Sequence, residues 1–478
     1  MKANIFLEKN PNSKIGKLIE RINGYIKGSI FQGHVFVVGG AVRDYVMGLE
    51  KQSSDCDIVV DLPDGGAKFA AWLAYQNGCN ISNKNPVFFP TYGTAKLQLL
   101  NDADLSDIEI ECVQTRKEKY IKGSRNPTTF FGTIYNDAMR RDLTINALYY
   151  NISTNSIWDI TNRGISDINN QIIRTTGKAN DIYEDDPLRM LLCIRFATRF
   201  NWGIEKDTWL GIISNVKNVN SLTQERITQE INKMLIGEHP GDAIDKMLKC
   251  GLLHEILPEI VQLTHIYQNI RPIKTGYEHT IDTLNNSIPK LEVRLAALLH
   301  DIGKIDTFDK NFLFHQIFSV NRTEEIMKRM KYSNSITDTV KLAVGNHESF
   351  SQYSGCTIPR PQVIRKFVDK FNGNNNAVNV CLDLIHANNI SQMFGKKIKQ
   401  VSGIRQKLEE LDKKGESAKK IELPITGIDI MKHLSIKPSA TVGALINKVK
   451  QAWIENPKLT KEEALKIVKD EFQKMSNH

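Results

Sequence analysis

The stretch Val35–Val60, VFVVGGAVRDYVMGLEKQSSDCDIVV, decides the fold of the first part of this chain. An apolar run meets two adjacent glycines, Gly39 and Gly40, and a second β-branched run follows a helix-like segment. Glycines directly after a strand let backbone N–H groups approach a phosphate. A dinucleotide-binding turn would instead carry GxGxxG and one acid about 20 residues later. The pattern therefore indicates a phosphate site of another kind.

The second run begins with two acids one residue apart, Asp55 and Asp57. Residues two apart in a strand point to the same face, so these carboxylates lie side by side and Cys56 turns into the core. Paired carboxylates repel each other unless a cation lies between them, and Mg²⁺ prefers carboxylate and phosphate oxygens. Glu109 and Glu111, which share one strand face, are candidates for a third carboxylate. The pair predicts a magnesium-bound nucleoside triphosphate; the alternative is a solvated acidic strand end.

A second cluster, AMRRDLTINAL, spans residues 138–148. Arg140 and Arg141 are cations suited to a triphosphate, and Asp142 is an acceptor suited to ribose hydroxyls. Asn146 adds a neutral hydrogen-bonding group near the start of what we predict to be an apolar helix. Such charge pairs also decorate many helices, so this cluster alone is a weak indication.

The third cluster, DIYEDDPLRMLLCIRFATRF, begins at Asp181. Pro187 is predicted to be the first residue of a helix with Asp186 at its cap. Asp186 and Arg189 are three apart and are therefore neighbours on one helical surface. An intrahelical ion pair is the structural alternative to a functional pair.

The order GGAVRD, DCD, RRDLTINAL, DDPLR and ERITQE, within about residues 20–240, resembles the bacterial-type tRNA nucleotidyltransferase and poly(A) polymerase family. That family belongs to the polymerase-beta-like nucleotidyltransferases, so the resemblance implies an α/β head followed by a mostly helical neck. It implies Mg²⁺ as cofactor, catalysis and Mg²⁺ binding by Asp55 and Asp57, and Glu111 as a third catalytic acid. It further implies that Gly39, Gly40 and Arg43 bind the triphosphate and that Arg140, Arg141, Asp142 and Asn146 bind the nucleotide and its ribose. Asp186 and Arg189 would then recognise the base, and Glu225 and Arg226 would support the neck helix.

An Asp–Arg pair can recognise a nucleotide base through the hydrogen bonds that its two side chains make. Cytosine and adenine both present an amino donor beside a ring-nitrogen acceptor, which a carboxylate and a guanidinium complement. Uracil and guanine reverse that polarity, and mismatched buried polar groups are costly. The pair therefore admits CTP and ATP and rejects UTP and GTP. We expect two-metal phosphoryl transfer to an RNA 3′-hydroxyl with release of pyrophosphate.

The second half carries histidines and an aspartate in an order that resembles the HD superfamily of metal-dependent phosphohydrolases: His279, His300, Asp301, His315 and His347. The resemblance implies an HD-type body and a second divalent metal. Asn388 stands where the closing metal aspartate of that superfamily would fall. Because an amide oxygen is a weaker ligand than a carboxylate, we expect the HD fold but not hydrolysis.

We expect four segments along the chain. The predicted boundaries are a nucleotidyltransferase head over 1–160, a base-recognising neck over 161–240, a helical HD-type body over 241–395 and a helical, tRNA-contacting tail over 396–478. The residues predicted to touch RNA in the last segment are Lys396, Lys397, Lys399 and Lys432, although a solvated helix face is an alternative.

The numbers of charged residues in the chain agree with a polyanionic partner. Lys and Arg number 63 against 54 Asp and Glu, giving a net charge of +9. Neutralising nucleic-acid phosphates releases counterions, which favours basic proteins. No apolar stretch is long enough for a membrane, and the seven cysteines form no CxxC pair. A cytoplasmic location is the default expectation.

The reading we favour is addition of C, C and A to the tRNA 3′ end from CTP and ATP. An enzyme of the same fold that adds only A, including a poly(A) polymerase, is the nearest alternative. An HD phosphohydrolase with a nucleotide-sensing head is a second, and a non-catalytic RNA-binding protein is a third. Intact Asp55 and Asp57 beside a substituted Asn388 argue against the second.

Overall fold

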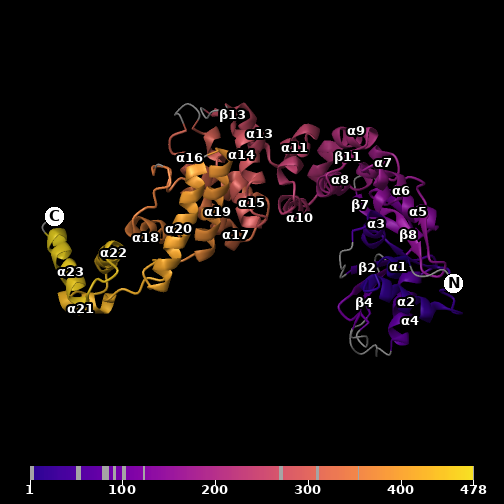
Figure 1. Ribbon diagram of the computed structural model, residues 1–478, viewed down its shortest axis with the longest axis horizontal. Coiled ribbons are helices and arrows are strands. Elements are labelled where there is room, and N and C mark those ends of the chain that lie inside the picture. The colour runs from indigo at the N-terminus through magenta and orange to yellow at the C-terminus, as the bar shows by residue number, and fades with distance from the viewer. Residues whose placement is uncertain are drawn as a thin grey trace. The chain divides into compact units, whose positions relative to one another are not determined.

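The computed structural model describes residues 5–49, 55–77, 86–89, 93–99, 104–121, 124–268, 273–307, 312–353, 355–393 and 395–476. The chain divides into two compact units. The first comprises Met1–Met234 and Asp245–Glu255, and the second comprises Leu235–Ile244 and Ile256–His478 (Figure 1). The finer division into head, neck, body and tail stays a prediction.

A seven-stranded mixed sheet forms the centre of the first unit, in the order β3-β4-β5-β2-β1-β8-β9. β2 and β5 are parallel, and the other neighbours are antiparallel. The strands predicted around residues 35, 56 and 109 are confirmed. Their bounds are β1 Val35–Val38, β2 Asp55–Val60, β3 Val87–Phe89, β4 Thr94–Leu97, β5 Glu109–Gln114, β8 Leu148–Asn151 and β9 Ser156–Asp159.

Helices and short strands surround this sheet. α4 packs against β5, β4 and β2, and a separate hairpin of β6 and β7 follows β5. The other elements that begin in the first unit are α1 Ile5–Lys9, α2 Lys14–Ile26, α3 Gly40–Met47, α4 Gly65–Gln76, β6 Arg116–Ile121, β7 Ser124–Phe131, α5 Ile134–Met139, α6 Gly164–Asn169, β10 Ile172–Ile173, α7 Ala179–Asp185, α8 Leu188–Phe200, β11 Gly203–Ile204, α9 Lys206–Asn215, α10 Gln224–Leu235 and α12 Leu252–Ile256.

The segment after Asp142 differs from the prediction. We expected an apolar helix there, but a single 3₁₀ turn, Thr144–Asn146, leads into strand β8. All four residues of β8 are buried, and the strand pairs with β1 on one side and β9 on the other. A fully buried strand shows no two-residue alternation, so its sequence resembles that of a buried helix.

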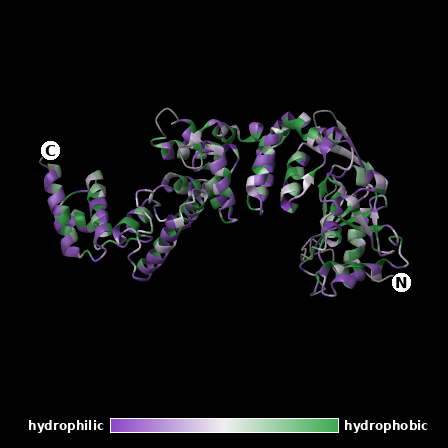
Figure 2. Cartoon of the chain, turned by 45° about the horizontal axis from the view of Figure 1, so that its top comes forward, coloured by the Kyte–Doolittle hydropathy of each residue, from purple (hydrophilic) through white to green (hydrophobic). Residues whose placement is uncertain are grey.

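The second unit is almost entirely helical, and green apolar faces alternate with purple polar faces along its helices in Figure 2. α19 packs against α14, α15, α17 and α20. α21, α22 and α23 share a small apolar core of their own. The remaining bounds are α11 Pro240–Cys250, α13 Pro258–Gln262, β12 Tyr267–Gln268, β13 Lys274–Thr275, α14 Gly276–Asn285, α15 Leu291–Leu299, α16 His315–Arg329, α17 Asn334–Asn346, α18 Pro361–Asp369, α19 Asn375–Ser391, α20 Gly395–Lys413, α21 Gly427–Leu434, α22 Ala440–Glu455 and α23 Lys461–Ser476.

Two expectations about the whole chain can be compared with the described residues. Within them, no helix has both the length and the apolar composition needed to cross a bilayer. The described cysteines are free thiols, as the absence of a CxxC pair suggested: Cys56, Cys112, Cys193, Cys250, Cys356 and Cys381. Cys79 lies outside the described residues.

Close packing of α4 on the sheet generates a stability prediction. A Cβ added to Gly66 would lie 2.8 Å from the carbonyl oxygens of Cys112 and Gly93, and backbone atoms cannot rotate away. Gly66→Ala should therefore lower the free energy of unfolding by about 1–3 kcal/mol, measured by urea denaturation. Gly24→Ala is the matched control, because no atom lies within 4 Å of the added Cβ inside α2. Equal loss of stability in both variants would contradict the packing argument.

Candidate functional site

The glycine turn lies directly against the acid pair. β1 and β2 are antiparallel with Val38 opposite Asp57, so the next residue, Gly39, comes beside that carboxylate. Gly39 has a φ of +70°, which favours glycine, and a Cβ there would lie 3.3 Å from Asp57 Oδ2. No side chain caps α3, which begins at Gly40. The helix N-terminus therefore offers backbone N–H groups to an anion beside the carboxylates.

The predicted alternation along β2 is confirmed. Asp55 and Asp57 are exposed and Cys56 is buried. In the parallel register with β5, Asp55 lies opposite Glu109 and Asp57 lies opposite Glu111. The exposed face of these two strands therefore carries carboxylates in two adjacent rows.

Lys96 is a neighbour of this cluster that the sequence reasoning missed. It lies on β4 opposite Glu111, with its Nζ 2.5 Å from Glu109 Oε1 and 3.5 Å from Glu111 Oε2. Loss of hydration raises the pKa of Asp57, the charges of Glu111 and Asp55 raise it further, and Arg141 and Lys96 lower it. The remaining excess of negative charge, together with hard oxygen ligands, fits a divalent ion such as Mg²⁺.

Three predicted nucleotide-site residues form one hydrogen-bonded chain. The buried Arg43 donates from Nη1 to Asn146 Oδ1 at 2.7 Å, and Asn146 Nδ2 donates to Asp142 Oδ1 at 3.2 Å. Arg43 also donates from Nε to Asp44 Oδ1 at 2.8 Å. Its guanidinium lies 5.1 Å from the ring centroid of Phe196 on α8. The triphosphate and ribose candidates are thus brought together, although about 100 residues separate Arg43 from Asp142 and Asn146.

Arg140 and Arg141 are held by a buried acid, Asp137, that the sequence reasoning also missed. Asp137 accepts from Arg140 Nη2 at 2.6 Å, from Arg141 Nη2 at 3.2 Å and from the Tyr149 hydroxyl at 2.7 Å. Although burial opposes its charge, Tyr149 and Asp137 raise the pKa of Arg141. The available signal was the spacing, because an acid three and four residues before two arginines predicts helical ion pairs.

The predicted base-reading pair lies at the junction of α7 and α8. α8 begins at Leu188 with Pro187 as its N-cap, one residue later than predicted. The Asp186 side chain still forms a hydrogen bond with the first turn of the helix, since its Oδ1 accepts from the Leu188 N–H at 3.2 Å. The Arg189 N–H donates to the Asp186 carbonyl at 3.0 Å, so the two residues are neighbours.

The predicted support of the neck helix by Glu225 and Arg226 stays a prediction. Glu225 and Arg226, in the first turns of α10, have exposed side chains. The buried acid of this helix is Glu230, which accepts from Arg195 Nε of α8 at 2.6 Å and from Lys233 Nζ at 2.7 Å. Glu230 thus joins α10 to α8, about one turn beyond the predicted pair.

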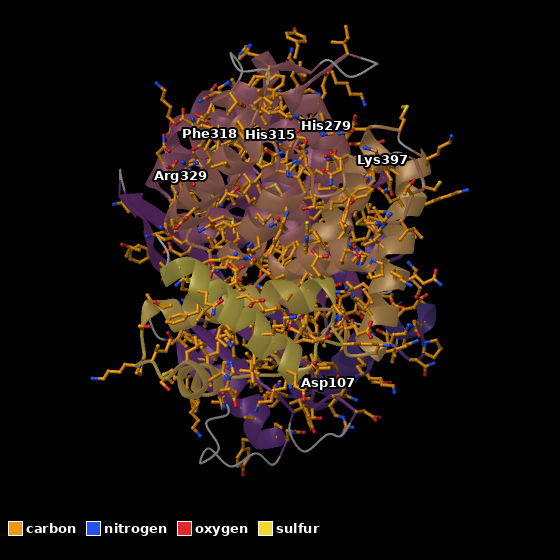
Figure 3. All side chains as sticks on the ribbon, turned by 90° about the vertical axis from the view of Figure 1, so that its left-hand side faces the viewer. Asp107, His279, His315, Phe318, Arg329 and Lys397 are labelled. Carbon is orange, nitrogen blue, oxygen red and sulfur yellow. The ribbon has the colours of Figure 1, made fainter. Side chains whose placement is uncertain are left out.

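In the second unit, four histidines surround one buried carboxylate (Figure 3 labels His279 and His315). Asp301 Oδ2 lies 3.5 Å from His279 Nε2 and 3.3 Å from His300 Nε2. Asp301 Oδ1 lies 3.2 Å from His315 Nε2 and 3.7 Å from His347 Nε2. All five predicted residues of the HD body therefore come together.

This cluster contains two groups of three residues whose ligand atoms lie within 4.8 Å of one another. The first triad is His279, His300 and Asp301, and the second triad is Asp301, His315 and His347. Burial lowers the pKa of His279 and of His347 to about 3, which keeps both imidazoles neutral. Neutral imidazoles and a carboxylate are ligands that divalent transition ions accept.

Asn388 lies on α19, but its amide oxygen is engaged within its own helix. Asn388 Oδ1 accepts from Gln392 Nε2 at 2.9 Å. Ser391, on the same helix, does contact the cluster, because its Oγ lies 3.4 Å from His279 Nδ1. An amide that already has a partner is a still poorer metal ligand than the sequence suggested.

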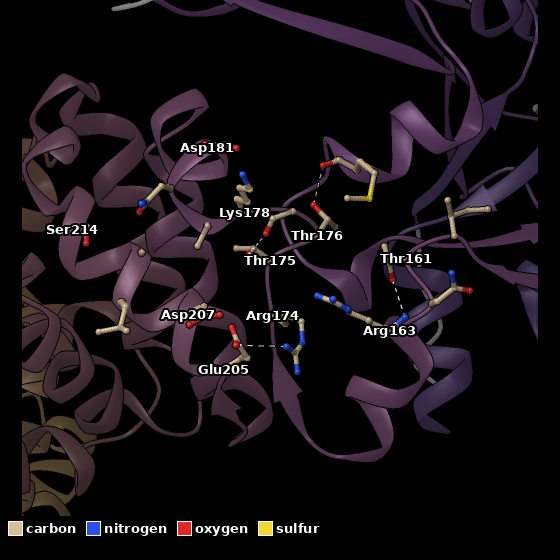
Figure 4. Close-up of a pocket in the computed structure, with 18 of the residues that line it drawn as sticks. Thr161, Arg163, Arg174, Thr175, Thr176, Lys178, Asp181, Glu205, Asp207 and Ser214 are labelled. Atoms are coloured by element: carbon tan, nitrogen blue, oxygen red, sulfur yellow. Dashed lines mark hydrogen bonds and ion pairs between the residues drawn. The ribbon is translucent and has the colours of Figure 1, made fainter.

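A cavity of about 820 Å³ also lies in the first unit (Figure 4). Among its lining residues are Arg163, Arg174 and Lys178 on one hand and Glu205 and Asp207 on the other. Arg174 Nη1 lies 3.6 Å from Glu205 Oε1, so part of its charge is already balanced. No residue predicted for the metal, triphosphate or base lines this cavity.

Comparison with protein families identifies three regions. Residues 35–174 match the "Poly A polymerase head domain", residues 201–263 match the "Probable RNA and SrmB- binding site of polymerase A", and residues 274–374 match the "HD domain". Enzymes with this head fold use divalent metal ions.

Individual relatives and solved structures agree. The chain is 25% identical to the mitochondrial CCA tRNA nucleotidyltransferase of Saccharomyces cerevisiae, over 91% of this chain and 87% of that protein. It is 31% identical to the Multifunctional CCA protein of Dechloromonas aromatica, over 66% of this chain and 73% of that protein. The fold resembles that of the Bacillus stearothermophilus CCA-adding enzyme in complex with CTP, with a TM-score of 0.65, 17% identity, and coverage of 96% and 99% of the two chains. The chain therefore belongs to the family of CCA-adding tRNA nucleotidyltransferases and poly(A) polymerases, and it carries an HD domain.

Proposed function

We propose that this protein adds C, C and A to the 3′ end of tRNA from CTP and ATP and releases pyrophosphate. The observation that carries the proposal is the position of the glycine turn beside Asp57, which brings a helix N-terminus and an acid pair to the same end of two central strands. Solved structures of similar fold include CCA-adding enzymes with CTP, with ATP and with tRNA. A net charge of +9 suits an RNA substrate.

In this proposal Asp55 and Asp57 hold Mg²⁺, with Glu111 as the third catalytic acid. Bound there, Mg²⁺ would activate the RNA 3′-hydroxyl and neutralise the triphosphate. Gly39 and Gly40 offer N–H groups to the phosphates, because they form the start of α3.

The cations of the site are positioned before substrate arrives. Asp44 and Asn146 hold Arg43, and Asp137 and Tyr149 hold Arg141. Charges fixed in this way need little rearrangement during the reaction, which is how electrostatic catalysis gains its advantage. Arg140 is held by the same acid and Asp142 accepts the ribose hydroxyls in the proposed complex.

Base choice is assigned to Asp186 and Arg189 at the start of α8. The carboxylate accepts from the amino group of C or A, and the guanidinium donates to the ring nitrogen.

We also retain the head, neck, body and tail boundaries at 160, 240 and 395 as a proposal. A cytoplasmic location remains part of it, although the Saccharomyces cerevisiae relative is named as mitochondrial.

The HD body is proposed to bind a second divalent ion. Its support is the convergence of four imidazoles on Asp301, which is buried and ionised. Although burial opposes ionisation, His300 and Lys304 hold the pKa of Asp301 well below its usual range.

Asp55→Ala should abolish nucleotide addition while tRNA affinity is retained, because the change removes a metal ligand and no RNA contact. We expect a loss of at least about 10³-fold in rate, the scale of a main electrostatic contribution. Product lengths are read at single-nucleotide resolution on tRNAs that end before CCA, after C and after CC. Asp107→Ala, an exposed acid paired with Lys14, is the control. Full activity of Asp55→Ala would end the assignment.

Arg189→Ala should let UTP and GTP compete with CTP and ATP. A donor pair to a base edge is worth about 1–3 kcal/mol of discrimination, so the preference should fall by roughly 5- to 150-fold. The ratio of kcat/KM values for the four nucleotides measures it. Arg163→Ala, an exposed arginine of the same unit, should leave the ratio unchanged. An unaltered preference in Arg189→Ala would show that base selection lies elsewhere.

Lys96→Met should move the acid limb of the pH–rate profile to higher pH. The pKa of Asp57 is raised by lost hydration and by Glu111 and Asp55, whereas Lys96 lowers it. Metal binding needs the carboxylate, so activity is lost as the pH falls through this raised pKa. Removing Lys96 raises the pKa further. Lys68→Met, remote on α4, is the control, and an unmoved limb in Lys96→Met contradicts the coupling.

A further inference from the structure

The buried guanidinium of Arg43 lies against two aromatic rings of α8. Its central carbon, Cζ, is 5.1 Å from the ring centroid of Phe196 and 5.2 Å from that of Phe200. The two rings are stacked, with centroids 5.9 Å apart and 24° between their planes. The attraction of a cation for a ring face is strongest where water is excluded, and Arg43 is only 4% exposed. The ring pair therefore adds a third contact to those that Asp44 and Asn146 make.

The polar contacts of Arg43 leave part of its guanidinium for an anion. Asp44 Oδ1 accepts from Nε at 2.8 Å and lies 2.7 Å from Nη2, and Asn146 Oδ1 accepts from Nη1 at 2.7 Å. A guanidinium has five N–H donors, so these three contacts do not use all of them. Nη2 lies 3.6 Å from the place of a Cβ at Gly40, the first residue of α3. The guanidinium thus lies beside the helix N-terminus to which the triphosphate is assigned.

α8 carries these rings on the same face as the arginine of the base-reading pair. Phe196 and Phe200 follow Arg189 by seven and eleven residues. At 3.6 residues per turn, these spacings are about two and about three whole turns, so the three side chains share one face. Seven residues of helix are about 10 Å long. One helix therefore fixes how far the base-reading pair lies from the contact with Arg43.

The two rings are fixed by neighbours of their own. The Arg195 guanidinium lies 4.4 Å from the ring centroid of Phe196, and its Nε donates to Glu230 Oε2 of α10 at 2.6 Å. The ring of Trp202 lies 5.1 Å from that of Phe200. Side chains whose rotamers are restricted by packing can hold a functional group in place. The ring pair is thus suited to position a cation.

We propose that Phe196 and Phe200 are positioning residues, which hold Arg43 at the triphosphate and set its distance from the base-reading pair. The inference rests on the roles proposed above for Arg43 and Arg189. Because the rings act through Arg43, weakening their attraction for it weakens binding of the triphosphate whatever base the nucleotide carries. The preference for C and A over U and G stays unchanged.

The test replaces Phe196, in the full-length chain, with phenylalanines that carry one, two or three ring fluorines. Each fluorine withdraws negative charge from the ring face and changes the size of the ring little. We expect kcat/KM to fall in steps, by roughly 2- to 30-fold over the series, which is the range that such contacts span. The fall should be equal for CTP and ATP. The inhibition constant of inorganic tripolyphosphate with Mg²⁺ should rise in parallel, because this ligand has phosphates and no base.

Two comparisons show whether the effect passes through Arg43. In the Arg43→Ala chain the same fluorines should change kcat/KM by less than about twofold, because the cation is absent. Phe69 is the matched control, a buried ring whose neighbours are the rings of Phe31 and Trp72, and fluorines there should have no graded effect. A stepwise fall that persists in the Arg43→Ala chain would overturn the inference, since Phe196 would then act by packing or through another cation.

Phe200 gives a second readout with natural amino acids. Phe200→Leu keeps an apolar side chain but removes the ring, so it should weaken inhibition by tripolyphosphate by roughly 2- to 30-fold. Phe200→Trp should retain the inhibition, since tryptophan offers a cation the best ring face. If only the space mattered, the larger tryptophan would do more harm than leucine, and that order would overturn the inference. Circular dichroism and tRNA affinity check the fold of each variant.

Failure of this inference can be told from failure of the proposed function. If Arg43→Ala leaves inhibition by tripolyphosphate unchanged, Arg43 does not bind the triphosphate, and both its proposed role and the inference are overturned. A flat fluorine series beside a clear loss in Arg43→Ala overturns only the positioning role of Phe196. Addition of C, C and A is tested separately by Asp55→Ala.

Discussion

The antiparallel register of β1 and β2 is the constraint on which the chemistry of the first unit depends. Val38 opposite Asp57 makes the chain turn at Gly39 directly beside a carboxylate, and α3 starts from that turn. A slip of one residue would turn both acids of β2 toward the core and bring Cys56 to the surface. Parallel pairing with β5 then adds Glu111 to the same face.

The charged side chains near the glycine turn and the acid pair are held by partners from distant parts of the chain. The buried Asp137 binds Arg140, Arg141 and Tyr149, and the buried Arg43 is shared by Asp44 and Asn146. Removing one partner from such a group leaves a buried charge uncompensated, which costs more than the pair contributes. The network therefore keeps the cations in place when neither metal nor nucleotide is bound.

The second unit organises its polar core around a single carboxylate. Backbone carbonyls at the ends of α15 and α17 and before α16 orient His300, His347 and His315 through their Nδ1 atoms. The Nε2 atoms are consequently turned toward Asp301. Three helix ends thus meet at one acid, and the tautomers follow from the backbone rather than from a bound ligand.

The sequence by itself determined the strands of the head, the pairing of Asp55 and Asp57 on one face, the helical second half and the membership of the HD cluster. Each depends on local periodicity or on a motif of a few residues, which a sequence displays directly. β8 was mistaken for a helix, because a strand buried on both faces has no alternation. The contacts of Lys96 with Glu109 and Glu111, of Asp137 with Arg140 and Arg141, and of Glu230 with Arg195 were not expected from the sequence. Only the tertiary structure decided these, because strand register and helix packing bring together side chains whose separation along the chain carries no signal.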